Sequence, residues 1–332
     1  MKRYLLNITL LLVCFSASSQ ETEMPKADWN GYTQLRFTSN FNEVNSFSMR
    51  RLKLWVNSTP SFNNRWGWKV QTTLTSNQNE KFFLQDVLVY YKEGQFQFNM
   101  GQFVPHFSLQ RFQPDFQIPL TERSTVIDAL IPNGTLGVRD IGIETQYTSK
   151  SKQLKAWLGV FNGYGIKEYR FDNTGILLTQ KTALNINNGH FHLGYSFMYR
   201  KANNLKVQKI LPDSITYSGG DIRLNAFAQY RTKHFSVQAE YLQANFEGYK
   251  SDGWYLLANL LIGKNIVAAS WNMYNDAIES NPNFTNVHLA YSYIADGDKL
   301  KVMIDNGINI QQNAIQNYVI TLQLQIFLND NL

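Results

Sequence analysis

The feature that most constrains this chain is a period-two alternation of apolar and polar residues that recurs from end to end. It is clear over residues 65–76, 191–200, 222–231 and 318–326. In the first segment the residues of one face are Trp66, Trp68, Val70, Thr72 and Leu74, and those of the other face are Lys69, Gln71 and Thr73. Successive side chains of a β-strand point to opposite faces, so this period predicts strands with one apolar and one polar face.

Three observations distinguish a membrane barrel from a soluble β-sandwich, which would also alternate. The segments run for about ten residues, the length of a tilted membrane strand, whereas strands of globular sheets average about five or six. Charged residues make up only 17% and aromatic residues 14% of the chain, against about 25% charged residues in ordinary domains. The aromatic residues gather towards strand ends, where they would meet lipid headgroups: Trp29, Tyr32, Trp66, Tyr147, Tyr199, Tyr318 and Phe327. A sandwich of this length would need several stacked domains.

The connections between the expected strands alternate in length. Short turns are expected at 91–95, 149–152, 187–189, 232–234, 263–265 and 295–298, and longer loops near 41–46, 104–136, 162–180, 201–219, 246–252 and 276–284. Short turns on one rim and long loops on the other are typical of outer-membrane barrels. In hydrocarbon every backbone polar group needs a partner within the protein, so the sheet must close. We therefore expect an all-β, transmembrane antiparallel barrel of about sixteen strands, enough to leave an aqueous channel.

The first twenty residues predict the compartment. Lys2 and Arg3 are followed by an apolar stretch, 4–15, and then by small residues, 16–20. This is the layout of a secretory signal peptide, so we expect residues 1–20 to be cleaved and 21–332 to form one barrel domain in the outer membrane of a Gram-negative bacterium. Cys14 is the only cysteine and lies in that segment, so the mature chain would carry no disulfide and no thiol. Its formal charge would fall from +6 to +4, because Lys2 and Arg3 are removed.

Five motifs follow one another in the first half of the chain. They are Arg50-Arg51-Leu52, the strand 84–91 around Asp86, the run 100–108 that begins Met100-Gly101-Gln102-Phe103, Arg139-Asp140-Ile141-Gly142, and Val160-Phe161-Asn162-Gly163. In this order they resemble the phosphate-selective porin O and P family of outer-membrane channels. The second half is similar to that family in strand rhythm more than in motifs.

The resemblance implies a sixteen-stranded barrel that forms a homotrimer, with the third long loop, 105–134, folded into the lumen as the constriction. The sequence departs from the pattern of the family at three positions. Val104 stands where relatives often carry lysine, Gln110 where they often carry glutamate, and the chain ends in Leu332 rather than an aromatic residue. The departure at Val104 weakens the implication of phosphate selectivity in particular.

If apolar residues face lipid, the wall of the lumen carries more cations than carboxylates. The expected cations are Arg36, Arg51, Lys53, Lys69, Lys155, Arg200, Arg223, Arg231 and Lys301, and the expected carboxylates are Asp140, Glu144, Glu240 and Asp305. A positive wall lowers the barrier for anions. Arg111, Arg123 and Arg139 flank or lie within the constriction loop, so they are the first candidates for selectivity, and Asp86 is the candidate anchor of that loop. The alternative, that the wall charges only pair with one another and solvate the wall, stays open.

The sequence lacks the residue patterns typical of metal sites, of common enzyme classes and of nucleic-acid binders. Of five histidines, only His190 and His192 have a spacing suited to a metal, without a third ligand in view, so we expect neither metal nor cofactor. We find no nucleophile elbow and no phosphate-cradling glycine loop, which argues against an enzyme. The charge is too sparse for a nucleic-acid binder. The leading hypothesis is passive diffusion of small anions such as phosphate across the outer-membrane lipid. A non-selective general diffusion porin is the main alternative, and a plugged adhesion barrel a further one.

Overall fold

The computed structural model describes residues 27–43, 45–76, 81–134, 136–166, 175–207, 210–211, 214–276, 283–312 and 314–329. The expected signal peptide, 1–20, lies outside these residues, so its cleavage stays a prediction. The first strands are β1 (Asp28–Ser39), β2 (Asn45–Ser58), β3 (Trp66–Thr75), β4 (Lys81–Glu93) and β5 (Phe96–Phe103). Three short helices follow, η1 (Gln110–Phe112), η2 (Asp115–Gln117) and α2 (Thr125–Leu130). The remaining strands are β6 (Asp140–Thr148), β7 (Leu154–Phe161), β8 (Ile176–Ile186), β9 (Phe191–Leu205), β10 (Tyr217–Arg231), β11 (Phe235–Phe246), β12 (Tyr249–Ile262), β13 (Asn265–Asn275), β14 (Phe284–Asp296), β15 (Leu300–Gln311) and β16 (Ala314–Phe327).

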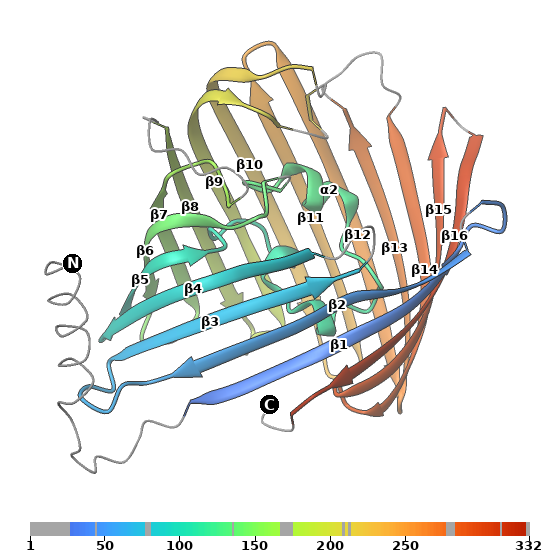
Figure 1. The fold of residues 1–332 in the computed structure, drawn as a ribbon, viewed down its shortest axis with the longest axis horizontal. Helices are drawn as coiled ribbons and strands as arrows, with labels where there is room; N and C mark the ends of the chain where they lie inside the picture. Colours follow the sequence, from blue (N-terminus) through green and yellow to red (C-terminus); the bar gives the residue numbers. More distant parts are fainter. Residues whose placement is uncertain are drawn as a thin grey trace, which may run out of the picture.

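These strands form a closed antiparallel barrel (Figure 1). Each strand pairs with its neighbours in sequence, and β1 closes the ring on β16 in a register that runs from Tyr32 opposite Phe327 to Ser39 opposite Ile320. Closure gives every strand two partners and removes the free edges that hydrocarbon would not tolerate. The prediction of a sixteen-stranded antiparallel barrel is confirmed.

The alternation in the sequence becomes an apolar outer face and a polar inner face. On β1 and β16, Leu35 and Leu322 are exposed on the outside, while Gln34 and Gln325 are buried inside and joined by a 2.8 Å hydrogen bond between Gln34 Nε2 and Gln325 Oε1. Exposure of this kind on a barrel marks the surface that lipid covers. No helix of the described residues is long and apolar enough to cross a membrane.

One of the longer loops expected from the sequence is absent. β11 ends at Phe246 and β12 begins at Tyr249, so only Glu247 and Gly248 join them, and the prediction of a longer loop near 246–252 is wrong. Gly248 has φ +86°, a conformation that glycine adopts without strain and that lets two residues reverse the chain. The polar residues 250–252 favoured a loop by composition, but they continue β12 and pair with β11.

The longest connection, residues 104–139 between β5 and β6, contains all three short helices. In Figure 1 it lies among the strands, with α2 in front of β11 and β12. Val126, Ile127 and Leu130 of α2 are fully buried and belong to an apolar cluster with Leu242 and Tyr255 of the barrel wall. Gly253 of β12 leaves room for this contact, since a Cβ there would lie 3.0 Å from the side chain of Val126. The connection therefore packs against the inner face of one wall of the barrel.

Candidate functional site

Carboxylates on the inner wall hold the 104–139 connection by its backbone. Glu240 of β11 accepts hydrogen bonds from the amides of Leu109 (2.8 Å) and Gln110 (2.7 Å). Asp305 of β15 accepts from the amide (2.9 Å) and hydroxyl (2.8 Å) of Thr121. Both carboxylates are almost fully buried, at 2% exposure each. Hydrogen bonds to ionised acceptors are the strong ones, so acids that the sequence placed in the lumen serve to tether the connection.

Several wall cations are also engaged with the connection. Arg223 of β10 donates to the carbonyl oxygens of Leu130 (3.0 Å) and Ile131 (2.7 Å), and its charge is paired with Asp221. Lys301 of β15 donates to the carbonyl oxygen of Phe116 at 2.7 Å. These two cations, expected to line an open lumen, are buried, and they fix the C-terminal end of α2 and the turn after Asp115 against the wall.

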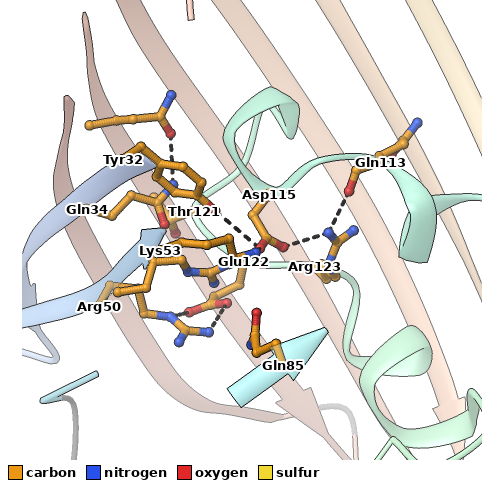
Figure 2. Close-up of polar contacts among 12 residues, drawn as sticks. Tyr32, Gln34, Arg50, Lys53, Gln85, Gln113, Asp115, Thr121, Glu122 and Arg123 are labelled. Atoms are coloured by element: carbon orange, nitrogen blue, oxygen red, sulfur yellow. Dashed lines mark hydrogen bonds and ion pairs between the residues drawn. The ribbon is translucent and has the colours of Figure 1, made fainter. Parts of the chain in front are cut away.

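Along β1 to β6, Asp115 forms the centre of a charged cluster beside open space. Lys53 Nζ lies 2.6 Å from Asp115 Oδ2, Arg123 Nη2 lies 2.6 Å from Oδ1, and Arg51 makes a third ion pair with the same carboxylate. The Tyr32 hydroxyl donates to it at 3.3 Å. Figure 2 shows Lys53 and Tyr32 reaching Asp115 from the strands and Arg123 reaching it from the connection. Burial alone would raise the pKa of Asp115, but Arg51, Lys53 and Arg123 hold it well below its usual range.

A second carboxylate of the connection, Glu122, binds two arginines. Arg36 Nη1 lies 2.7 Å from its Oε1, and Arg50 donates through Nε at 2.6 Å and Nη2 at 2.9 Å. Strict alternation would point Arg50 and Arg51 to opposite faces. The register of β2 against β1 shifts at Gln34/Leu35, so that Arg50 is the extra residue of a bulge and both arginines reach the lumen.

A third cluster forms around Asp86 on β4. Its carboxylate pairs with Lys69 Nζ at 2.8 Å and with Arg139 Nε at 3.0 Å, and Arg139 lies at the C-terminal end of the long connection. A register shift at Gln71/Thr72 makes Gln85 the extra residue of a second bulge, so that Gln85 and Asp86 both face the lumen. There Gln85 Oε1 accepts a 3.2 Å hydrogen bond from Arg139. This bulge explains why the alternation of residues 84–88 is blurred in the sequence. The role of Asp86 as the anchor of the loop stays a prediction.

Arg111 on η1 differs from these cations. Within the described part of the chain its guanidinium makes no hydrogen bond or ion pair, and its Nε is buried without a partner. Burial, with repulsion from Arg123 and Arg139, lowers the pKa of Arg111 to about 9, so the group is still charged at neutral pH. An arginine that carries its charge without a fixed partner is suited to meet a mobile anion.

Two cavities meet at these residues. The first, of about 500 Å³, reaches Trp55, Gln97 and Gln146 near the short turns, and we call it the turn-side cavity. The second, of about 430 Å³, reaches Thr75 and Ile166 near the long loops, and we call it the loop-side cavity. Among the described residues, five line both: Lys53, Arg111, Asp115, Arg123 and Arg139. Four of these are cations and one is an anion, so the shared boundary carries a surplus of three positive charges.

The structure brings the candidate selectivity and anchor residues together, while other expected wall cations, such as Arg223 and Lys301, bind the connection instead. Arg51, Lys53, Lys69, Arg111, Arg123, Arg139 and Asp86 line one or both cavities, and Arg36 pairs with Glu122 beside them. Arg50, Asp115 and Glu122 were missed. The Arg50-Arg51 pair was visible as a motif, and it is the bulge that makes both residues face the lumen. Asp115 and Glu122 lie in an irregular segment without a strand period, so the sequence does not indicate whether their side chains face the lumen.

Acid pH tests the two carboxylates of the connection. The pKa of Glu122 is lowered to about 2 because Arg50 and Arg36 outweigh burial, and the pKa of Asp115 is also held well below its usual range. A depressed folded-state pKa stabilises the fold above the unfolded value, about 4, and the contribution is lost as pH falls through the folded value. We expect thermal stability, followed by the heat-dependent mobility of the folded barrel in detergent gels, to be flat from pH 7 to about 4.5 and to fall between about 4 and 2. Glu122→Gln should be less stable at pH 7 and should lose less over the acid range; a wild-type loss centred at pH 6 would contradict this account.

No group of three or more histidine, cysteine, aspartate or glutamate side chains in the described ranges could hold a metal ion. The side chains at the shared boundary of the two cavities are fixed charges, four cations and one carboxylate. Fixed positive charges of this kind attract anions.

A closed antiparallel barrel with an apolar outer face and a polar inner face is the architecture of outer-membrane channels of Gram-negative bacteria. The sequence model of the family described as phosphate-selective porin O and P matches residues 27–265, and the chain belongs to that family.

Solved structures share the fold at low sequence identity. A loop-L8 deletion mutant of OmpT of Vibrio cholerae has a TM-score of 0.68 at 11% identity, covering 92% of this chain and 100% of its own. An anion-selective porin from Comamonas acidovorans has a TM-score of 0.68 at 10% identity, covering 91% and 99%. OmpF of Salmonella typhi has a TM-score of 0.67 at 10% identity, covering 91% and 98%. A search of curated protein sequences finds no match to this chain.

Proposed function

We propose that this porin lets small hydrophilic anions, phosphate-like oxyanions among them, diffuse through the barrel in preference to cations. The observation that carries the proposal is the boundary between the two cavities, where Lys53, Arg111, Arg123 and Arg139 surround the single carboxylate of Asp115. A solute passing from one cavity to the other meets this surplus of positive charge in a narrow space with low-dielectric walls, which favours anions. The family and the anion-selective porin of similar fold support the same direction.

A general diffusion porin remains the second candidate because of one feature of the site. Most of the cations are ion-paired, as Lys69 and Arg139 are with Asp86, and paired charges bias a current weakly. The two candidates differ in whether Arg111 acts on permeating ions. We assign the chain to transport rather than catalysis.

The proposal extends to the assembly. A trimer form is recorded for OmpT of Vibrio cholerae, a protein of similar fold, and we propose a homotrimer with its outer apolar face in the outer-membrane lipid. Chemical cross-linking of the detergent-purified protein should then give a ladder that ends at three chains.

The reversal potential of the purified protein in planar bilayers tests the preference. Across a KCl gradient we expect a potential of the sign that marks chloride as the more permeant ion, and we expect added phosphate to reduce the chloride current in a saturable way. A fixed positive charge about 4 Å from the path is worth about 1 kcal/mol even at the dielectric constant of water, or about fivefold in ion concentration. A potential near zero that phosphate leaves unchanged would instead support the general porin.

A further inference from the structure

The turn-side cavity has a wall that a passage for inorganic ions alone would not need. Besides its cations it is lined by Trp55, Leu88, Phe112 and Phe116, which are half-buried and keep part of their apolar surface facing the cavity. Small-molecule sites have volumes of about 300–1,000 Å³ and combine apolar and aromatic walls with a few placed polar groups. At about 500 Å³ the turn-side cavity has this size and this composition.

The aromatic side chains are fixed from behind. The ring of Phe112 stacks on that of His106, with centroids 4.1 Å apart and an interplanar angle of 8°, and His106 Nδ1 lies 2.6 Å from Glu144 Oε1. The ring of Phe116 packs edge-on against Tyr32 at 5.6 Å and against Phe327 at 4.9 Å. Rings that are held in place before a ligand arrives lose little conformational entropy when it binds.

The charged side of the same cavity holds Arg111, directly next to Phe112 in the sequence. Its Nε is buried, and no hydrogen bond among the described residues engages its Nη atoms, so a ligand carboxylate in the cavity could accept from the Nη atoms. A planar guanidinium binds a carboxylate through two parallel N–H donors and also stacks on aromatic faces. The loop-side cavity, by contrast, is lined mainly by charged and polar side chains such as Arg50, Thr73 and Gln85.

We propose that the turn-side cavity is a binding subsite for aromatic carboxylates, with the carboxylate at Arg111 and the ring against Phe112, Phe116 and Trp55. This inference rests on the proposed anion preference and names a substrate class for the same passage. An inorganic oxyanion gains nothing from apolar walls, whereas the ring of an aromatic acid removes both its own apolar surface and that of the wall from water.

Block of the KCl current in planar bilayers tests the subsite with four probes. Benzoate is expected to reduce the current at a concentration at least about tenfold lower than acetate, which has the same headgroup; tenfold corresponds to about 1.4 kcal/mol. Benzyl alcohol, which keeps the ring and lacks the charge, is expected not to block, and phosphate serves as the reference oxyanion. Phe112→Ala and, separately, Trp55→Leu are expected to remove most of the advantage of benzoate over acetate while phosphate block persists.

Phe98→Ala is the matched control, because Phe98 is exposed on the outer face of β5, 47% accessible, and lies outside the cavity. The heat-dependent gel mobility of each variant shows that the barrel has folded. Equal block by benzoate and acetate, equal block by benzyl alcohol, or unchanged benzoate block in both cavity variants would each overturn the subsite. If the wild-type protein shows neither a preference for chloride nor block by phosphate, the proposed anion preference itself is overturned.

Discussion

Arg111→Gln is expected to abolish most of the preference of the channel for anions while leaving the barrel and its conductance largely intact. Arg111 lines both cavities, and its guanidinium has no partner within the described residues, so removing it deletes charge without freeing a carboxylate. We expect the ratio of chloride to potassium permeability, obtained from the reversal potential, to fall about fivefold or more towards one. Glutamine keeps much of the length of the side chain, so the packing of η1 should change little.

The matched control is Arg65→Gln, which removes the same charge elsewhere. Arg65 is an exposed arginine that pairs with Glu93 on the rim of short turns. Surface pairs of this kind contribute little to stability, and the permeability ratio should stay at the wild-type value. If Arg111→Gln also leaves the ratio unchanged, the shared boundary does not select ions and the general porin is the better description.

Arg111 and Arg123 are equal candidates in the sequence, and the structure separates them. Arg123 donates to the carbonyl oxygens of Gln110 and Gln113 and pairs with Asp115, so its guanidinium is fully used in holding the connection together. A change at Arg123 would therefore alter the shape of the passage together with its charge. Pairing could not be read from the sequence, because it depends on how an irregular segment crosses the lumen.

The barrel, by contrast, was almost wholly predictable. Lipid outside and water inside impose a strict alternation on each strand, and closure determines the pairing of neighbours. The failures lie where a local device breaks that rule: the bulges that turn Arg50 and Gln85 inwards, and the two-residue turn at Glu247 and Gly248. A bulge adds one residue to one strand, and nothing in the composition of residues 45–58 marks the position of that residue.

The sequence also could not predict which groups the wall carboxylates bind. The lumen was expected to contain four acids that oppose the cations, and three of them, Glu144, Glu240 and Asp305, bind backbone amides of the connection. These carboxylates keep their charge, but neither Glu240 nor Asp305 lines either cavity. The acids that hold the backbone of the connection therefore lie away from the shared boundary, where the lining residues carry the positive surplus.

Releasing these tethers should widen the passage. In the double variant Glu240→Gln, Asp305→Asn, each amide replaces a carboxylate that accepts two hydrogen bonds from the connection, at Leu109 and Gln110 and at Thr121. Hydrogen bonds to charged groups are worth about 1.5–3 kcal/mol each, so the backbone at residues 109–110 and 121 should loosen, while the ion pairs of Asp115 and Glu122 and the packing of α2 still hold the connection to the wall. Single-channel conductance is expected to rise roughly twofold or more, with a smaller anion preference, because the charged boundary moves away from the path.

Asp252→Asn is the control, since Asp252 contacts Tyr241 and Asn275 and does not touch the connection. An unchanged conductance, together with unchanged resistance of residues 105–123 to limited proteolysis, would show that the ion pairs of Asp115 and Glu122 and the packing of α2 hold the connection without these two carboxylates.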